Sequence, residues 1–182
     1  MITNLKTIVK FLPCSKGIAK LMNNLGHNCN RHDWVDVYYS LTPEQQTKDI
    51  DFKFILGSNG VKDTFWALCT QPKKIKLLIG ADVVESVLHI YEEKYPNDMR
   101  VRNCIQGVRD FCNGKITQER LNVLKQDAYA AHATGSTAAA NAANGSVYDA
   151  AVATTTVAYA AVDVDAFAEQ WKKNEEILLK YI

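Results

Sequence analysis

The sequence predicts an all-α protein, a single-domain multi-helix bundle with a tightly packed second half. The first observation is the composition of residues 126–168, where about two residues in five are Ala and no Pro, Lys or Arg occurs. Alanine has the highest helix propensity, and its small side chain lets neighbouring helices approach closely. The second observation is that all four prolines lie in the first 96 residues. We therefore expect one domain over residues 1–182, in which a helical subdomain, 1–70, precedes an Ala-rich core bundle, 71–182.

The start of the chain predicts short elements separated by breaks. Residues 2–11 have an apolar spacing that suits a helix or a strand, and Pro13 ends this element. Residues 15–25 carry apolar side chains at helical intervals and stop at Gly26, a suitable residue for the position after a helix. Another element begins at Trp34, for which helix is favoured over strand.

The next elements are marked by capping residues and turns. The motif Thr-Pro-Glu-Gln at 42–45 predicts a helix start with a capping box. Residues 51–56 alternate as in a strand, but no partner strand is obvious, so we expect a helix and leave the strand open as the alternative. Residues 57–60 predict a turn, and residues 61–69 predict a short helix.

Residues 73–95 predict the most hydrophobic helix of the chain. Two apolar stripes run along it, so it should be covered on two sides and lie at the centre of the bundle. One stripe comprises Leu77, Ala81, Val84, Leu88, Tyr91 and Tyr95, and the other comprises Ile79, Val83, Val87 and Ile90. Pro96 ends it, the pair at 97–98 caps a helix over 99–112, and Thr117 caps another.

The Ala-rich tract contains two Gly-Ser steps, 135–136 and 145–146, which should divide it into about three helices. The last helix, 164–181, is amphipathic. Its expected inward side chains are Val164, Phe167, Trp171, Leu178 and Ile182, and its expected outward side chains are Glu169, Lys172, Lys173, Glu176 and Lys180.

Charge and cysteine content exclude several protein classes. A formal net charge of +1 and a pI near 7.6 do not suit a broadly basic DNA binder or an acidic DNA mimic. The five cysteines are odd in number and scattered, and no signal-peptide hydrophobic region is present, so we expect reduced thiols and a cytoplasmic protein. The longest apolar run is too short to span a bilayer, so no membrane contact is expected.

The one dense group of charged residues comprises Glu92, Asp98, Arg100, Arg102 and Arg109. Arg102 and Arg109 share a helix face and can reach Glu85 or Glu92 of the preceding helix in bidentate pairs. The main interpretation is a structural network that clamps the turn between the two helices. The alternatives are arginines that grip an acidic or phosphate-bearing partner, and general acid catalysis by Glu92.

Other candidate motifs predict no cofactor and no metal. His27, Cys29 and His32 form a cluster of possible zinc ligands, but a fourth ligand at a matching spacing is missing. His89 and His132 lie beside apolar neighbours, so core or boundary positions are expected for both.

Residues 87–114 carry a resemblance to a known family. The Tyr-Glu step, the following Pro-x-Asp and the two arginines of Arg-Val-Arg resemble the signature of the immunity-protein-five-like proteins of bacteria and their phages. The residues carried over are Glu92, Pro96, Asp98, Arg100, Arg102, Ile105 and Arg109. The Ala-Tyr-Ala-Ala repeats at 128–131 and 158–161 and the Cys-x-x-Gly at 14–17 are similar to the same family.

Three positions, Val101, Gln106 and Gly107, depart from the pattern of that family. The resemblance covers residue 61 to the C-terminus, whereas residues 27–65 match nothing in the family, which makes 1–70 a variable N-terminal subdomain.

The resemblance implies an all-helical, non-catalytic inhibitor that binds and neutralises a nuclease or toxin by steric occlusion. Its candidate aromatic anchors are Tyr38, Tyr39, Trp66 and Tyr148, and the charged turn near Arg100 would form a polar rim. One alternative is a phage-encoded anti-defence protein, such as an anti-CRISPR protein that binds a CRISPR nuclease.

Two other function classes stay open. The first is a small-ligand or nucleotide-binding helical protein or enzyme built on Glu92, Arg100, Arg102 and Arg109. The second is a homodimer whose Ala-rich helices pack between subunits. Nucleic acid would be contacted only through the protein partner or through the basic cluster of Lys73, Lys74 and Lys76, which is otherwise a solvated face.

Overall fold

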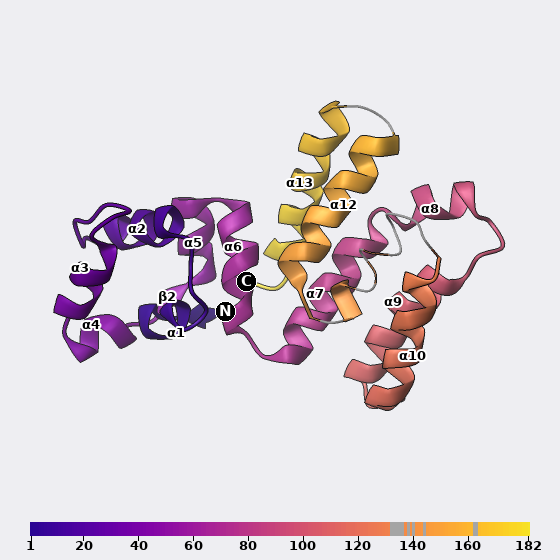
Figure 1. The fold of residues 1–182 in the computed structure, drawn as a ribbon, viewed down its shortest axis with the longest axis horizontal. Coiled ribbons are helices and arrows are strands. Elements are labelled where there is room, and N and C mark those ends of the chain that lie inside the picture. Colours follow the sequence, from indigo (N-terminus) through magenta and orange to yellow (C-terminus); the bar gives the residue numbers. More distant parts are fainter. Residues whose placement is uncertain (132–136, 138, 140, 144, 162–163) are drawn as a thin grey trace. The chain divides into compact units, whose positions relative to one another are not determined.

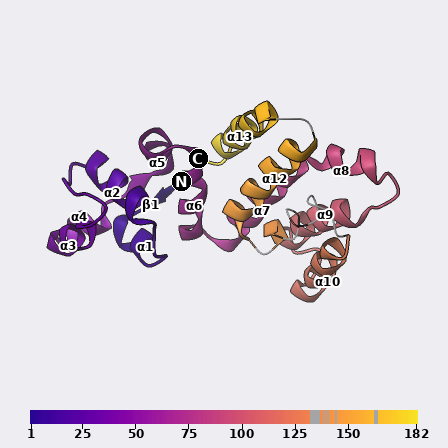
Figure 2. The same cartoon turned by 45° about the horizontal axis from the view of Figure 1, so that its top comes forward.

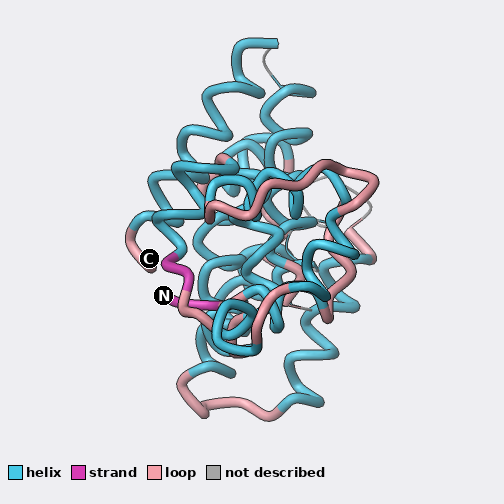
Figure 3. The backbone as a smooth tube through the Cα atoms, turned by 90° about the vertical axis from the view of Figure 1, so that its left-hand side faces the viewer, coloured by secondary structure: helices cyan, strands magenta, loops and turns pink. Residues whose placement is uncertain are grey.

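The computed structural model describes residues 1–131, 137, 139, 141–143, 145–161 and 164–182. Helices dominate these residues, and two short strands form the sheet of this described part (Figures 1 and 3). The predicted all-α class is therefore confirmed. Within the same residues, no helix is both long enough and apolar enough to cross a membrane. The chain groups into two compact units, Met1–Gln71 with Ile182 and Pro72–Tyr181; that these form one domain stays a prediction.

The first unit combines short helices with a two-stranded antiparallel sheet. Strand β1 (Ile2–Thr3), labelled in Figure 2, pairs with β2 (Ile50–Asp51). In this pairing Ile2 lies opposite Asp51 and Thr3 opposite Ile50. The helices of this unit are α1 (Leu5–Val9), α2 (Ser15–Asn24), α3 (Trp34–Ser40), α4 (Pro43–Thr47), α5 (Phe52–Asn59) and α6 (Val61–Ala67), followed by a 3-10 turn, η1 (Leu68–Thr70).

Four helices of this unit begin after a residue whose side chain accepts a hydrogen bond from the backbone of the first turn; these residues are Asn4, Cys14, Thr42 and Asp51. The hydroxyl of Thr42 accepts a hydrogen bond from the backbone N–H of Gln45, and the side-chain Oε1 of Gln45 accepts one from the backbone N–H of Thr42, which confirms the capping box. Cys14 caps α2, because its Sγ accepts from the backbone N–H of Gly17 at 3.3 Å. The ambiguous residues 2–11 form both a strand, β1, and a helix, α1.

Two expectations for this unit need correction. The segment 51–56 is mainly helix, as expected, but Asp51 also pairs in β2, because the partner strand is the two-residue β1 at the start of the chain. The predicted turn at 57–60 is helix as far as Asn59. Within residues 57–60, Gly60 alone has a positive φ, +91°, and it ends α5.

The core of the first unit is built from the inward faces of its helices. Phe52 and Phe65 are both buried, at 0% and 1% exposed. The other large side chains that are almost completely buried there are Leu5, Ile8, Ile18, Met22, Ile55 and Leu68.

The second unit is a helical bundle around α7 (Lys73–Glu85). Helix α7 packs against α9 (Arg100–Cys112), α12 (Val147–Ala161) and α13 (Val164–Leu179), while α10 (Gln118–Tyr129) packs on α9 (Figure 1). Both apolar stripes of α7 are buried, as the sequence predicts. The buried side chains include Leu77, Ile79, Ala81, Val83 and Val84, whereas Tyr95, at the end of one predicted stripe, is 39% exposed.

The close approach of helices predicted for this half has a direct example. A Cβ atom on Gly80 of α7 would lie 3.1 Å from the Cβ of Ala142 and 3.2 Å from its Cα. Such a contact is possible only because one residue has no side chain and the other has a methyl group.

The predicted single helix over 73–95 is wrong, because the chain breaks at 86–87. Helix α7 ends at Glu85, and α8 (Leu88–Lys94) begins after Val87, whose φ is −115° and ψ is 5°. The hydroxyl of Ser86 donates to the carbonyl of Val83 at 2.6 Å and accepts from Gln170 at 2.7 Å. A side chain that bonds to the backbone in this way competes with the helical hydrogen-bond pattern.

The last helix buries Trp171 and Leu178 as predicted, but Phe167 is 38% exposed. In place of Phe167, α13 buries Gln170 and Asn174, which are 2% and 0% exposed. The side chain of Val164 and the Gly-Ser step at 135–136 lie outside the described residues.

The buried amide of Asn174 joins α13 to α12. The Nδ2 of Asn174 donates to the carbonyl of Ala151 and to the hydroxyl of Thr154, and its Oδ1 accepts from Gln170. The predicted break at 145–146 is confirmed, since Gly145 has a φ of +76° and α12 starts at Val147.

Candidate functional site

The charged residues that the sequence singles out lie on α8, α9 and the turn between them. We call residues 92–102 the charged turn. At its centre is Asp98, whose carboxylate accepts a hydrogen bond from the backbone N–H of Arg100, the first residue of α9, at 3.1 Å. The guanidinium of Arg100 lies 2.6 Å from the same carboxylate, and the phenol of Tyr91 donates to it at 2.8 Å. The predicted cap at 97–98 is therefore shifted: Asp98 satisfies one free backbone N–H of α9, but the N-cap position is Met99, whose side chain forms no capping hydrogen bond.

These contacts shift the protonation of both partners. The hydrogen bond from Arg100 holds the pKa of Asp98 well below its ordinary range, and the bond from Tyr91 acts in the same direction. Burial, followed by the hydrogen bond to Asp98, raises the pKa of Tyr91 to about 12. At neutral pH the turn therefore holds a carboxylate and a neutral phenol.

A second ion pair joins α9 to α8. The Nε and Nη2 of Arg102 donate to the two carboxylate oxygens of Glu92, each at 2.6 Å. This is the bidentate geometry that the sequence predicts. The side chains of Arg102 and Glu92 stay 48% and 26% exposed, so the pair lies at the surface.

A third group ties α9 to α7. Arg109 donates to both oxygens of Glu85, at 2.9 and 2.7 Å, and to Asp82 at 2.7 Å. The hydrogen bond from Arg109 lowers the pKa of Glu85, and the bond to Glu85 raises the pKa of Arg109. The phenol of Tyr181, beyond the end of α13, donates to Asp82 at 2.6 Å.

Sequence reasoning missed three members of this network: Tyr91, Asp82 and Tyr181. Asp82 could have been found, because it lies three residues before Glu85 and thus on the same helix face. Tyr181 could not, since its partner is 99 residues away.

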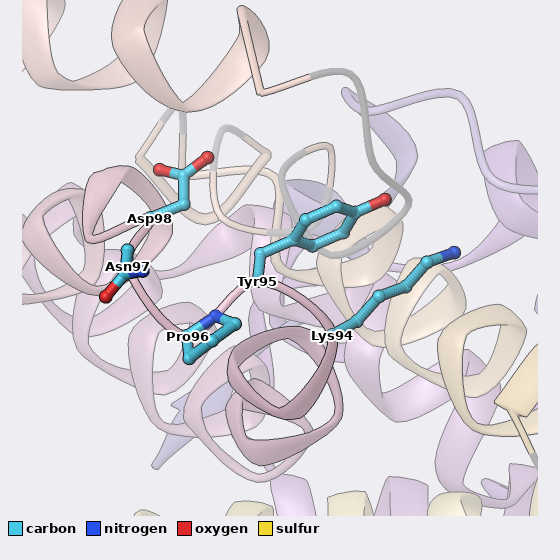
Figure 4. Close-up of a pocket in the computed structure, with 5 residues that line it drawn as sticks. All are labelled: Lys94, Tyr95, Pro96, Asn97 and Asp98. Carbon is cyan, nitrogen blue, oxygen red and sulfur yellow. The ribbon is translucent and has the colours of Figure 1, made fainter.

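The charged turn also carries a shallow hollow of about 440 Å³, lined by Lys94, Tyr95, Pro96, Asn97 and Asp98 (Figure 4). Lys94 and Tyr95 extend from the end of α8, and the Nζ of Lys94 lies 5.5 Å from the centre of the Tyr95 ring (Figure 4). Tyr95 is 39% and Met99 46% exposed. Apolar and aromatic surface therefore lies beside the arginines.

The four predicted aromatic anchors lie in different settings. Tyr38 is buried, with 6% of its surface exposed, and its ring packs edge-on against that of Tyr39, with 5.2 Å between the ring centres. Tyr39 is 74% exposed, so it is the ring of this pair that a partner could reach. Trp66 is half-buried on α6, and Tyr148 on α12 is 36% exposed. Of the four, Tyr148 belongs to the same unit as the charged turn.

The basic cluster is partly engaged within its own unit. The Nζ of Lys73 donates to Gln118 at 2.7 Å and lies 5.3 Å from the centre of the Phe111 ring. Lys74 is exposed and Lys76 is half-buried.

The prediction for His89 is wrong, because its side chain is exposed on α8 while its neighbour Leu88 points into the core. His132 lies outside the described residues.

The cysteines are free thiols with different environments. Cys29 is buried, and its backbone N–H and carbonyl both bond to the side-chain amide of Asn23. Burial raises the pKa of Cys29, and it raises the pKa of Cys104 to about 12. In the part of the chain that the structure describes, no three His, Cys, Asp or Glu side chains are arranged to hold a metal ion.

Comparison with known proteins places the chain in a family. A family model described as "Imm-5 like putative immunity protein" matches residues 67–174. This match covers more than half of the chain, and the chain belongs to that family. Searches of curated proteins and of solved structures gave no significant match.

Proposed function

We propose that this member of the Imm-5 like family is a non-catalytic inhibitor that binds a nuclease or toxin and blocks it sterically. The observation that carries the proposal is the state of the charged turn: each of its predicted charged residues is already engaged in an ion pair inside the chain. Paired carboxylates and guanidinium groups are poorly suited to act as a general acid or base. Such ion pairs instead hold the side chains of a surface in fixed positions, which suits a binding site.

The same pairs favour binding because they fix the turn in advance. The guanidinium of Arg100 donates three hydrogen bonds to Asp98, and that of Arg102 donates two to Glu92. Side chains that are ordered before association lose less conformational entropy on binding. Because the Arg100 and Arg102 side chains are 43% and 48% exposed, they stay accessible to a partner.

The composition of the charged turn supports a protein partner. Tyr95 and Met99 are exposed between the two helices, next to the arginines. Tyrosine, methionine and arginine are enriched in protein interfaces, and an exposed aromatic ring within a polar rim is the usual form of an interaction anchor. We therefore expect the partner to contact Tyr95 and Met99, with Arg100 and Arg102 at the rim.

Capture followed by an activity assay tests the proposal. The tagged chain would be incubated with a lysate of its host at moderate salt, and a protein recovered in stoichiometric amount would be assayed for nuclease activity or toxicity with and without the chain. We expect the captured protein to be inactive in the complex. The identity of the captured protein would distinguish an inhibitor of a toxin or nuclease from an anti-defence protein that binds a defence nuclease such as a CRISPR effector.

Matched variants make this test specific to the charged turn. Tyr95→Ala with Met99→Ala should weaken the complex at least about tenfold, because interface anchors carry most of the binding energy. Val123→Ala removes a comparably exposed apolar side chain, 44% exposed on α10, and should leave binding unchanged. Recovery of no stoichiometric protein, or full activity of the captured protein in the complex, would rule the proposal out.

A further inference from the structure

The loop between α1 and α2 presents two large apolar side chains to solvent. Phe11 is 47% and Leu12 88% exposed. Leu12 has a φ of +53° and is the one non-glycine residue with a positive φ in the described part of the chain. We call Phe11 and Leu12 the apolar tip.

The conformation of the apolar tip is unfavourable for the residues that occupy it. A left-handed backbone is the usual place for Gly, and a branched side chain such as that of Leu12 is strained there. Pro13 follows directly and restricts the preceding residue further. The tip is nonetheless fixed, since the backbone of Phe11 bonds to Ile8 and that of Leu12 to Val9.

The first unit therefore holds a leucine in a strained position where its side chain gains almost no burial. Glycine would relieve the strain, and a polar residue would suit the solvent. Burial of Leu12 against another surface is the contact that would offset both costs.

Lysines flank the apolar tip on both sides along the chain. Lys6 and Lys10 lie one turn apart along α1 and its C-cap, and Lys16 and Lys20 one turn apart on α2; all four are exposed. Residues 1–32 contain no Asp or Glu. One acidic side chain from elsewhere, Asp63, lies beside Gly17 and accepts a hydrogen bond from Asn59.

The presence of lysine and not arginine around the apolar tip favours a lipid surface over a protein partner. All four cations around the tip are lysines, which are depleted in protein interfaces, where arginine is preferred. A compact, strongly hydrated ammonium group suits diffuse attraction to phosphate headgroups, and apolar side chains between such groups can enter the boundary of the acyl chains. Figure 2 shows α1 and α2, whose ends carry this loop.

We infer that the apolar tip and its four lysines dock the protein on an anionic lipid surface, with Phe11 and Leu12 entering the membrane interface. This contact is peripheral and departs from the expectation of no membrane contact, which concerned a bilayer-spanning segment. It does not depend on the proposed inhibitor function, since a different unit carries the charged turn.

Co-sedimentation with vesicles tests the inference. The full chain would be mixed with vesicles of equimolar phosphatidylcholine and phosphatidylglycerol, and with vesicles of phosphatidylcholine alone. We expect binding to the anionic vesicles that decreases as salt is raised, and little binding to the neutral ones. Leu12→Gly should weaken binding about tenfold or more while preserving the fold, because glycine tolerates the left-handed backbone.

Two further variants separate lipid binding by the apolar tip from a general effect of surface substitutions. Lys10→Glu with Lys16→Glu should abolish binding to anionic vesicles, whereas Val35→Ala, which removes a 41% exposed apolar side chain of the same unit, should leave it unchanged. Absence of binding to anionic vesicles, or unchanged binding of Leu12→Gly, would overturn the inference. If vesicles are not bound and Leu12→Gly instead weakens the complex with the captured target, the tip is a protein contact and the lipid inference is wrong.

Discussion

Arg109 and Glu85 form two parallel hydrogen bonds between α9 and α7, with nitrogen to oxygen distances of 2.9 and 2.7 Å. Arg109 also reaches Asp82, one turn earlier on α7, at 2.7 Å. Its side chain is 25% exposed, so the guanidinium is mostly removed from water and depends on both carboxylates. This arrangement fixes the helix that carries the arginines of the charged turn against the centre of the bundle.

Replacement of Arg109 should destabilise the second unit. Arg109→Ala leaves Asp82 and Glu85 without their shared cation and should lower the free energy of unfolding by about 1–2 kcal/mol. Arg109→Lys keeps the charge but loses the bidentate geometry, so it should lower the free energy of unfolding by a smaller but measurable amount. Urea denaturation would measure both. Lys115→Ala, in which a 68% exposed side chain loses a 3.6 Å contact with Asp110, should have no measurable effect.

Stability should decrease in acid because of Glu85 and Asp98. Arginine hydrogen bonds lower the pKa of both carboxylates in the folded chain, from ordinary values of 4.5 and 3.8. A lowered folded pKa stabilises the folded state above the unfolded pKa, and this stabilisation is lost as the pH falls through the folded pKa. The free energy of unfolding should therefore be constant near neutral pH and should decline below the ordinary carboxylate range.

A series of denaturation curves across pH would measure this decline. In Glu85→Gln the decline should be shallower than in the unchanged chain, because one linked carboxylate is gone. An identical pH dependence in the two proteins would contradict the role assigned to Glu85.

Two glycines in helices should respond to substitution in opposite ways. Gly80→Leu would place a large side chain against the backbone of Ala142, because even a Cβ on residue 80 would lie 3.2 Å from the Cα of Ala142. The substitution should lower the free energy of unfolding by about 1–3 kcal/mol or more. Gly57→Ala, in α5, meets nothing within 4 Å and should stabilise its unit by about 0.5–1 kcal/mol. Thermal unfolding of both variants would measure the effects, and equal shifts would contradict the close packing of α7.

The buried amide of Asn174 should be essential for the packing of α12 on α13. Asn174→Leu leaves the hydroxyl of Thr154 and the amide of Gln170 without one partner each, and should cost about 1–3 kcal/mol. Lys173→Ala, at the exposed neighbouring position, should change the free energy of unfolding by no more than about 0.5 kcal/mol. If Asn174→Leu proved as stable as the unchanged chain, the network would have no structural role.

Local features of the sequence were sufficient for much of the fold. The capping residues Thr42 and Thr117, the terminating Gly26 and the turn at Gly145 mark helix boundaries through contacts within a few residues. The spacing of Arg102 and Arg109 likewise indicated their pairing with Glu92 and Glu85, because the two helices are adjacent in the sequence.

The sequence by itself determined the helical class, the helix starts after Thr42 and Thr117 and the ion pairs between neighbouring helices, because these depend on backbone propensity and short-range spacing. Only the tertiary structure decided the pairing of Ile2 with Asp51, the break at Ser86 and the burial of Asn174. Each of these depends on a partner far along the chain, and the free energy of a distant contact has no signal in the local pattern of residues.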